Sequence, residues 1–129
     1  MRKIKFRGQR EDNKEWVYGF VHTNLTIEPN YYFITTGYNQ DPTYVVDNKT
    51  IDQYTGLKDK NGVEIYEGDV LRDGKGEDGV VVYFSSIGCF MIQVRNVIFN
   101  LNENDPNRPT KLQYTEVIGN IHENKEELV

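Results

Sequence analysis

The sequence predicts a mostly β protein with little helix. Its 129 residues include nine tyrosines and six phenylalanines, and aromatic side chains favour strands. Short apolar runs of strand length alternate with clusters of Gly, Asn, Asp and Pro along the chain, a spacing typical of hairpin-connected strands. No window shows the 3.6-residue apolar period of an ordinary amphipathic helix. These observations together predict antiparallel sheets.

The N-terminal part is expected to supply four strands. Ile4 and Phe6 alternate with basic residues, the period-two pattern of a half-buried strand. A polar turn follows, and three more runs rich in aromatic and β-branched residues come after it. The expected strands cover residues 3–7, 16–21, 31–36 and 44–46.

The stretch 53–69 is the richest in turn signals, because it holds Thr55-Gly56 and Asn61-Gly62. The stretch 102–109 contains two prolines and three asparagines and is expected to be an exposed loop. Residues 122–128 are expected to form one helical turn. The other segments of the C-terminal part are expected to be strands, at 64–71, 80–84, 89–94, 97–101, 112–114 and 117–118.

Composition narrows the class of protein. The net charge of −5 argues against nucleic acid as the main partner, because affinity for phosphate comes from excess Lys and Arg. Cys89 is the single cysteine, which fits a reducing compartment. No apolar run approaches the roughly 20 residues that a membrane-spanning helix needs, and no secretory signal is recognised. We therefore expect a cytoplasmic protein with no membrane partner.

The motifs that suggest chemistry have structural explanations. Residues 74–79 match G-x-G-x-x-G, but a strand follows where a dinucleotide site needs a helix, so we interpret them as a hairpin loop. The acidic residues around Gly62 lack the EF-hand spacing. One cysteine and two widely separated histidines do not make a zinc ligand set. We predict a protein that is not an enzyme, with no cofactor, no metal and no catalytic residue.

The basic first strand has two interpretations. If Ile4 and Phe6 face the core, Lys3, Lys5 and Arg7 line an exposed face. Cations interleaved with aromatic rings bind single-stranded nucleic acid by stacking and phosphate contacts. A charged outer face that prevents unwanted strand pairing produces the same pattern. The acidic character of the rest of the chain favours the second interpretation.

Three segments, at the start, middle and end of the chain, form a specific set. They are Met1-Arg2-Lys3-Ile4-Lys5-Phe6-Arg7, the run from Gln53 to Val70 that includes Asn61-Gly62 and Glu67-Gly68-Asp69, and Val117-Ile118-Gly119-Asn120-Ile121-His122-Glu123-Asn124. In this order they resemble the YopX family of small phage and prophage proteins. Two positions depart from the family pattern: Gln9 stands where an aromatic residue is common, and Lys125 stands where proline is usual.

The resemblance implies a β-rich fold of coiled antiparallel sheets with a C-terminal SH3-like barrel. On this basis we expect an N-terminal β region at 1–52 and a barrel region at 53–129, packed as one unit. It also implies a phage or prophage gene acting in the cytoplasm of a bacterial host. The family carries no established activity, so no catalytic residue is transferred to this chain.

The middle motif has two interpretations as well. Its glycines can adopt positive φ in tight turns, which makes the motif structural. Alternatively, its polar and aromatic residues form a binding surface on loops. The residues of this candidate surface are Gln53, Tyr54, Asp59, Asn61, Tyr66 and Glu67.

The leading hypothesis is a non-enzymatic protein-binding or self-assembling module. Opposite charge at the two ends of the chain can join protomers head to tail, and the candidate charged interface comprises Lys3, Lys5, Arg7, Glu126 and Glu127. The partner is then a second copy or a host or phage protein. The alternative is a nucleic-acid-binding small barrel. An enzyme would need titratable groups that converge in a pocket, and no such set is evident.

Overall fold

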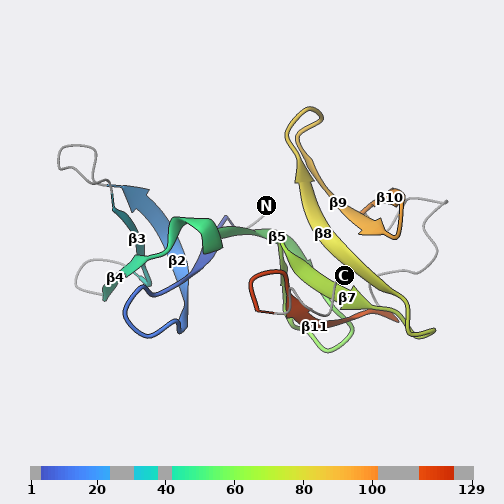
Figure 1. Ribbon diagram of the computed structural model, residues 1–129, viewed down its shortest axis with the longest axis horizontal. Coiled ribbons are helices and arrows are strands. Elements are labelled where there is room, and N and C mark those ends of the chain that lie inside the picture. Colours follow the sequence, from blue (N-terminus) through green and yellow to red (C-terminus); the bar gives the residue numbers. More distant parts are fainter. Residues whose placement is uncertain (1–3, 24–30, 38–41, 102–113, 124–129) are drawn as a thin grey trace. The chain divides into compact units, whose positions relative to one another are not determined.

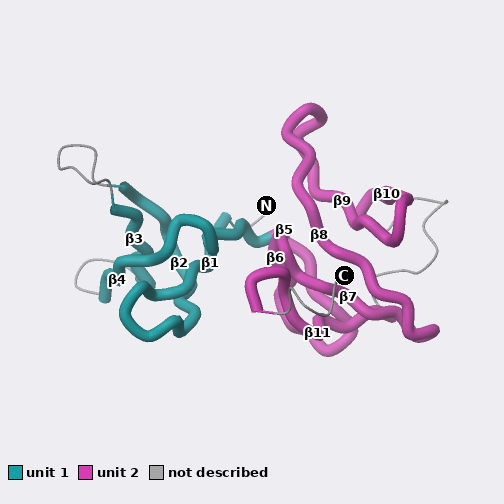
Figure 2. Tube along the Cα trace, in the orientation of Figure 1, with its two compact units in different colours: residues 1–54 teal, residues 55–129 magenta. Residues whose placement is uncertain are grey.

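The computed structural model describes residues 4–23, 31–37, 42–101 and 114–123. The chain forms two compact units, unit 1 at Met1–Tyr54 and unit 2 at Thr55–Val129 (Figure 2). The described residues contain strands and short 3₁₀ segments and no α-helix. The strands of the described residues pair antiparallel, which confirms the mostly β prediction.

Unit 1 is a meander in which each strand pairs with the next, in the order β4-β3-β2-β1. The start of β5 pairs with the free side of β1, where Arg7 lies opposite Asp52. All four strands expected from the sequence are present, with shifted ends. Its elements are β1 (Phe6–Gln9), β2 (Trp16–Thr23), β3 (Tyr32–Thr35), β4 (Thr43–Val46), η1 (Asn48–Thr50) and the first residues of β5 (Asp52–Lys58).

The sheet of unit 1 curls so that β4 returns to the end of β1. An antiparallel bridge joins Arg10 to Val46, with backbone hydrogen bonds from Glu11 N to Val45 O (3.1 Å) and from Asp47 N to Gln9 O (2.9 Å). The curled sheet leaves room for only a small residue on its inner side at position 8. A Cβ at Gly8 would lie 3.1 Å from Ile34 Cδ1 and 3.2 Å from Val46 Cβ.

Unit 2 is built around a five-stranded sheet in the order β10-β9-β8-β7-β11. The long β8–β9 hairpin is its most extended feature (Figure 1). The remaining part of β5 lies beside β6. The new elements are β6 (Glu64–Tyr66), β7 (Asp69–Arg72), β8 (Asp78–Phe84), β9 (Cys89–Val94), β10 (Val97–Asn100) and β11 (Glu116–Asn120).

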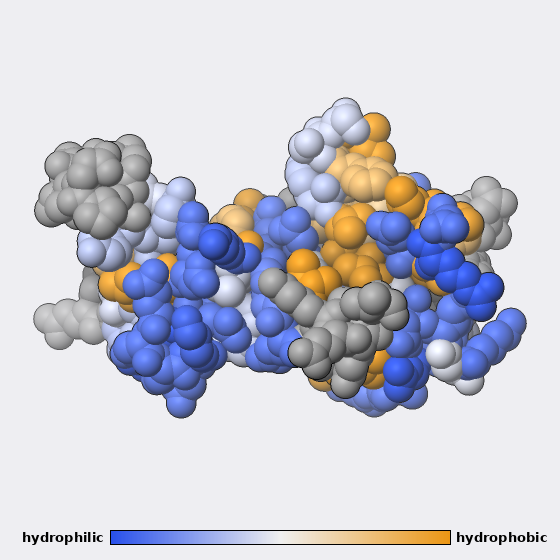
Figure 3. All heavy atoms as spheres, in the orientation of Figure 1, coloured by the Kyte–Doolittle hydropathy of each residue, from blue (hydrophilic) through white to orange (hydrophobic). Residues whose placement is uncertain are grey.

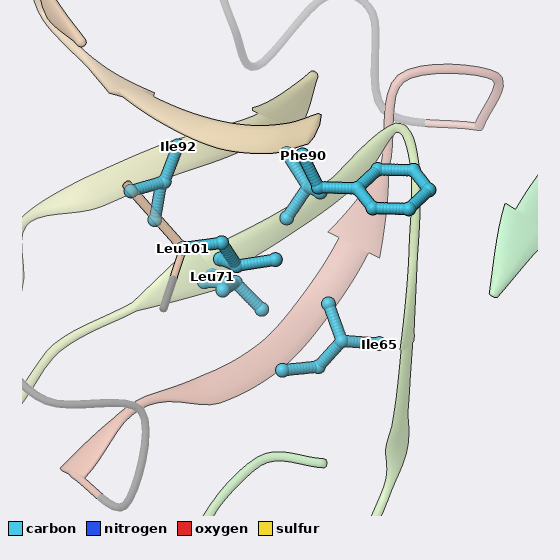
Figure 4. Packing of buried hydrophobic residues seen from close by; sticks show 6 residues of the cluster. Ile65, Leu71, Phe90, Ile92 and Leu101 are labelled. Carbon is cyan, nitrogen blue, oxygen red and sulfur yellow. The ribbon is translucent and has the colours of Figure 1, made fainter. Parts of the chain in front are cut away.

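The core of unit 2 lies on one face of this sheet. Figure 4 shows side chains from several strands pointing toward one another, Leu71 from β7 and Ile92 from β9 among them. Burying one such aliphatic side chain contributes about 1.5–3 kcal/mol. The cluster consists of Ile65, Leu71, Val81, Phe90, Ile92 and Leu101.

Two hairpin loops of unit 2 share one hydrogen-bond design, each organised by an aspartate. In the first, Asp59 N donates to Val63 O (2.9 Å), and Asp59 Oδ1 accepts from the amides of Asn61 (2.8 Å) and Val63 (2.9 Å). The second loop, from Asp73 to Glu77, repeats these bonds at distances of 2.9, 2.8 and 2.9 Å. The match to G-x-G-x-x-G lies in this second loop, so it is a hairpin loop, as expected.

The structure departs from the sequence predictions in four places. The expected strand at 64–71 is interrupted by a turn at Glu67-Gly68, so β6 and β7 are separate strands. Residues 53–58 form most of strand β5, where turns are expected, because β5 pairs with β1 and lies beside β6. The described part of unit 2 has an open sheet, and no closed barrel is found, so the SH3-like barrel is not confirmed. Tyr114 is not in a strand, and residues 112–113 and most of the expected helical turn lie outside the described residues.

Candidate functional site

The candidate surface on the middle motif loses three of its members to burial. Tyr54 is 5% exposed, Asp59 7% and Tyr66 2%. The Lys5 ammonium lies 5.4 Å from the centre of the Tyr54 ring. The Asp59 carboxylate accepts three backbone amides, the third from Val117 at 2.9 Å. These side chains hold the fold together and do not form a solvent-facing surface.

The other three members of that surface do not replace them. Gln53 is half-buried in β5, opposite Phe6. Asn61 is exposed on its hairpin loop, with Nδ2 3.5 Å from Glu116 Oε2. Glu67 is half-buried in unit 2. The structural interpretation of the middle motif is therefore the better one.

The candidate charged interface is also changed by the structure. Arg7 is 6% exposed, and its Nε donates to Asp52 Oδ2 at 3.0 Å. Ile4, which the alternation places on the opposite side of the strand from Arg7, is 59% exposed. The prediction that Ile4 faces inward and Arg7 outward is therefore wrong. Lys5 is half-buried against Tyr54, and Lys3, Glu126 and Glu127 lie outside the described residues.

A different surface stands out on β2. Successive residues of a strand point to opposite sides, so Tyr18, Phe20 and His22 share one side of β2. Tyr18 and Phe20 are each 46% exposed, and His22 is also exposed. Val17 and Val21, on the opposite side, are half-buried beside the small core. We define the aromatic face as Trp16, Tyr18, Phe20 and His22 of β2 together with Phe33 of β3.

One end of the aromatic face is held in place by stacking and hydroxyl contacts. The His22 ring stacks on Phe33 with centroids 5.3 Å apart and an interplanar angle of 16°. His22 Nε2 is hydrogen-bonded to Thr35 Oγ1 at 3.0 Å, and Thr35 Oγ1 lies 2.8 Å from Thr43 Oγ1. This chain of contacts runs from β2 across β3 to β4. It restricts the rotation of the imidazole, so this part of the face is ordered in advance.

The other end of the aromatic face contains a compensated cation. The Arg7 guanidinium lies 4.8 Å from the centre of the Trp16 ring, within cation–π range. Because Asp52 neutralises Arg7, this end presents little net charge. The face as a whole offers rings and hydroxyls, a combination suited to contact with another apolar and hydrogen-bonding surface.

Sequence reasoning missed the aromatic face although a signal was available. Aromatic residues recur at 16, 18, 20 and 22, and Val, Gly and Val alternate with them. Both sets are apolar, so the hydropathy pattern does not say which side is covered. The fold decides it: the interior beside Gly8, Ile34 and Val46 is narrow and admits the smaller set.

An open groove of about 540 Å³ lies elsewhere on unit 1. The Arg10 guanidinium lies 4.4 Å from the centre of the Tyr44 ring and bonds to the Asp12 carboxylate, with Nε 2.9 Å from Oδ1. That hydrogen bond lowers the pKa of Asp12 below its ordinary value. Arg10 is thus already engaged. The groove is lined by Arg10, Glu11, Asp12, Tyr31, Thr43, Tyr44 and Val45.

Within the described residues, no three His, Cys, Asp or Glu side chains gather in a way that would hold a metal ion. The same part of the chain contains no helix long and apolar enough to cross a membrane.

Comparison with known proteins places the chain in a family. The family model described as YopX protein matches residues 5–129, which is nearly the whole chain. The crystal structure of protein EF1440 from Enterococcus faecalis is similar, with 27% sequence identity, a TM-score of 0.60 and full coverage of both chains. No protein with a curated description matches. This confirms the resemblance seen in the sequence: the chain belongs to the YopX family.

Proposed function

We propose that this protein is a non-enzymatic binding module of a phage or prophage, acting in the bacterial cytoplasm, and that the aromatic face of unit 1 binds another protein. The observation that carries the proposal is the pair of aromatic rings at Tyr18 and Phe20, each 46% exposed on one side of β2. The phage setting rests on the family resemblance. The binding role rests on the surface itself.

Exposed aromatic rings on a strand are well suited to protein recognition. Tyrosine and phenylalanine have two rotatable side-chain bonds each, so ordering them costs little entropy for the area they bury. Interface cores are enriched in aromatic residues and depleted of charged ones. Truncating a central aromatic side chain typically costs about 2 kcal/mol or more of binding free energy. The exposed rings of Tyr18 and Phe20 match this description.

The charge of unit 1 favours a protein partner over nucleic acid. Met1–Tyr54 contains seven Lys and Arg residues and seven Asp and Glu residues. Phosphate binding requires uncompensated cations, and Arg7 is paired with Asp52. The partner surface is therefore expected to be apolar, with groups that hydrogen-bond to the hydroxyls of Thr35 and Thr43.

The test places a photo-crosslinking amino acid at position 20 and, as a matched control, at position 83. Tyr83 is an aromatic residue of unit 2 with 42% exposure, close to that of Phe20. Irradiation in bacterial host cells should capture a specific protein from position 20 and not from position 83. The Tyr18→Ala/Phe20→Ala variant should weaken binding of the captured protein by at least tenfold, while Tyr83→Ala leaves it unchanged.

Two outcomes would count against the proposal. Equal capture from both positions would show that the aromatic face is not selective. Alternatively, labelled single-stranded oligonucleotides that bind at low salt, and lose binding in Tyr18→Ala/Phe20→Ala, would replace the protein partner by nucleic acid, because phosphate binding weakens steeply with added salt.

A further inference from the structure

Strand β10 forms an edge of the five-stranded sheet of unit 2. It pairs with β9 through a two-residue turn at Arg95-Asn96, where Arg95 has φ 56°. In such a hairpin the pair that closes the turn, Val94 and Val97, is hydrogen-bonded, and the bonded positions then alternate. The pair of Gln93 and Ile98 is therefore not hydrogen-bonded. The backbone N–H and C=O of Ile98 point away from β9.

Within the described residues, the edge at β10 carries none of the sequence features that usually prevent strand pairing. Native sheets protect their edges with charged residues, prolines, bulges or a covering segment. The strand Val97–Asn100 contains no charged residue and no proline, and its register with β9 is regular. Two of its side chains are well exposed, Val97 at 52% and Ile98 at 40%.

Other sheet edges within the described residues carry features that oppose strand pairing. On β11 the register shifts between Val117 and Gly119, and Glu116 at its start lies 3.7 Å from the Lys60 ammonium. On β4 the bridge from Arg10 to Val46 occupies part of the edge. The contrast with β4 and β11 marks β10 as an edge whose sequence leaves strand pairing open.

We propose that β10 pairs antiparallel with β10 of a second copy, about a two-fold axis at Ile98. Each Ile98 then donates its N–H to the C=O of the other, and the two apolar side chains meet on one face. The contact is isologous, as a closed dimer requires. It brings no like charges together, because β10 carries none.

Two observations favour a second copy as the occupant of this edge. The segment of the same chain that follows β10 is polar and contains Pro106 and Pro109, and proline cannot donate to a ladder. Apolar residues also gather around the adjoining β8–β9 hairpin (Figure 3), where Ile87 is 61% exposed. This inference is independent of the aromatic face of unit 1.

Sedimentation equilibrium tests the dimer from about 1 to about 300 μM, a range that brackets weak protein association. The wild type should approach twice its mass of 15.1 kDa. Ile98→Pro removes the outward N–H without removing a bond to β9, and it should raise the dimer dissociation constant at least tenfold. Ile98→Lys keeps the N–H but sets two ammonium groups opposite each other, and it should do the same. Ile98→Thr is the control and should dimerise within threefold of wild type.

Cysteine crosslinking tests the register. Hydrogen-bonded antiparallel residues have Cα atoms about 5.5 Å apart, within the range that a disulfide spans. In a Cys89→Ser background, Ile98→Cys should form a covalent dimer on mild oxidation. Asn96→Cys, in the turn that precedes β10, should not.

A wild type that stays at 15.1 kDa throughout the range would overturn the proposal. So would Ile98→Lys that is folded by circular dichroism and dimerises as wild type does. Should Ile98→Pro fail to fold, Ile98→Lys and the cysteine pair decide the question. Equal crosslinking at 96 and 98 would overturn the two-fold axis at Ile98.

Discussion

Arg7 and Asp52 form a buried ion pair that joins the first strand of unit 1 to the start of β5. Arg7 Nε lies 3.0 Å from Asp52 Oδ2, and the two side chains are 7% and 6% exposed. The residues are 45 positions apart in the sequence but directly opposite each other in the sheet. Trp16 covers the guanidinium. Arg7, which the sequence pattern places on a basic surface, therefore connects two strands in the interior of unit 1.

Removing one partner of this pair should be costly. Arg7→Met leaves the Asp52 carboxylate buried without its cation, and such a loss typically costs about 3–5 kcal/mol of unfolding free energy. Urea unfolding followed by circular dichroism measures it. The matched control is Arg7→Met/Asp52→Leu, which removes both charges and should recover at least half of the loss. An Arg7→Met variant within about 0.5 kcal/mol of wild type, the range of ordinary surface changes, would contradict the assignment.

The two aspartate-organised hairpin loops should differ in their contribution to stability. Asp59 is 7% exposed and bonds to Val117 of β11 in addition to its own loop. Asp73 is half-buried, so when its carboxylate is removed, water can replace part of its hydrogen bonding to the loop amides. We expect Asp59→Ala to cost about 3 kcal/mol and Asp73→Ala about 1 kcal/mol, measured by urea unfolding. Equal costs would show that the contact to β11 contributes nothing.

Two glycines should respond differently to alanine. A Cβ at Gly19 would lie 2.1 Å from Thr35 O, so β3 would have to move away from β2. At Gly62 the φ is 79° and nothing lies within 4 Å of the added carbon, which leaves a backbone cost of about 1–2 kcal/mol. Thermal unfolding should show Gly62→Ala folded with a lower Tm. Gly19→Ala should lose more than about 4 kcal/mol, and a Tm equal to that of Gly62→Ala would refute the close approach.

The contact between Arg10 and Asp12 has a consequence for titration. The hydrogen bond from Arg10 lowers the pKa of Asp12 below 3.8. Because the folded pKa is depressed, the stabilising contribution is present above the ordinary value and is lost as pH falls through the folded pKa. Arg10→Gln should raise the pKa of Asp12 toward 3.8, as followed by NMR of its side-chain carboxyl carbon. An unchanged titration would show that the contact does not persist in solution.

The positions of most strands and turns can be predicted from the amino-acid sequence. Strand signals depend on the alternation of neighbouring side chains and on turn residues, both of which are local. The paired strands β8 and β9 and the loops at Asp59 and Asp73 are therefore predictable from short stretches. The family, too, is readable from residues in the start, middle and end of the chain, as the match over residues 5–129 confirms.

Which side of each strand is covered depends on the packing of the folded chain. Arg7 is buried because Asp52 and Trp16 meet it from other strands, and Ile4 is exposed although it is apolar. The aromatic residues of β2 face outward because the curl of the sheet leaves a narrow interior, closed by the bridge from Arg10 to Val46. Period-two alternation indicates that the two sides of a strand differ, but the burial of each side depends on what packs against it. That depends on residues tens of positions away, which local patterns do not contain.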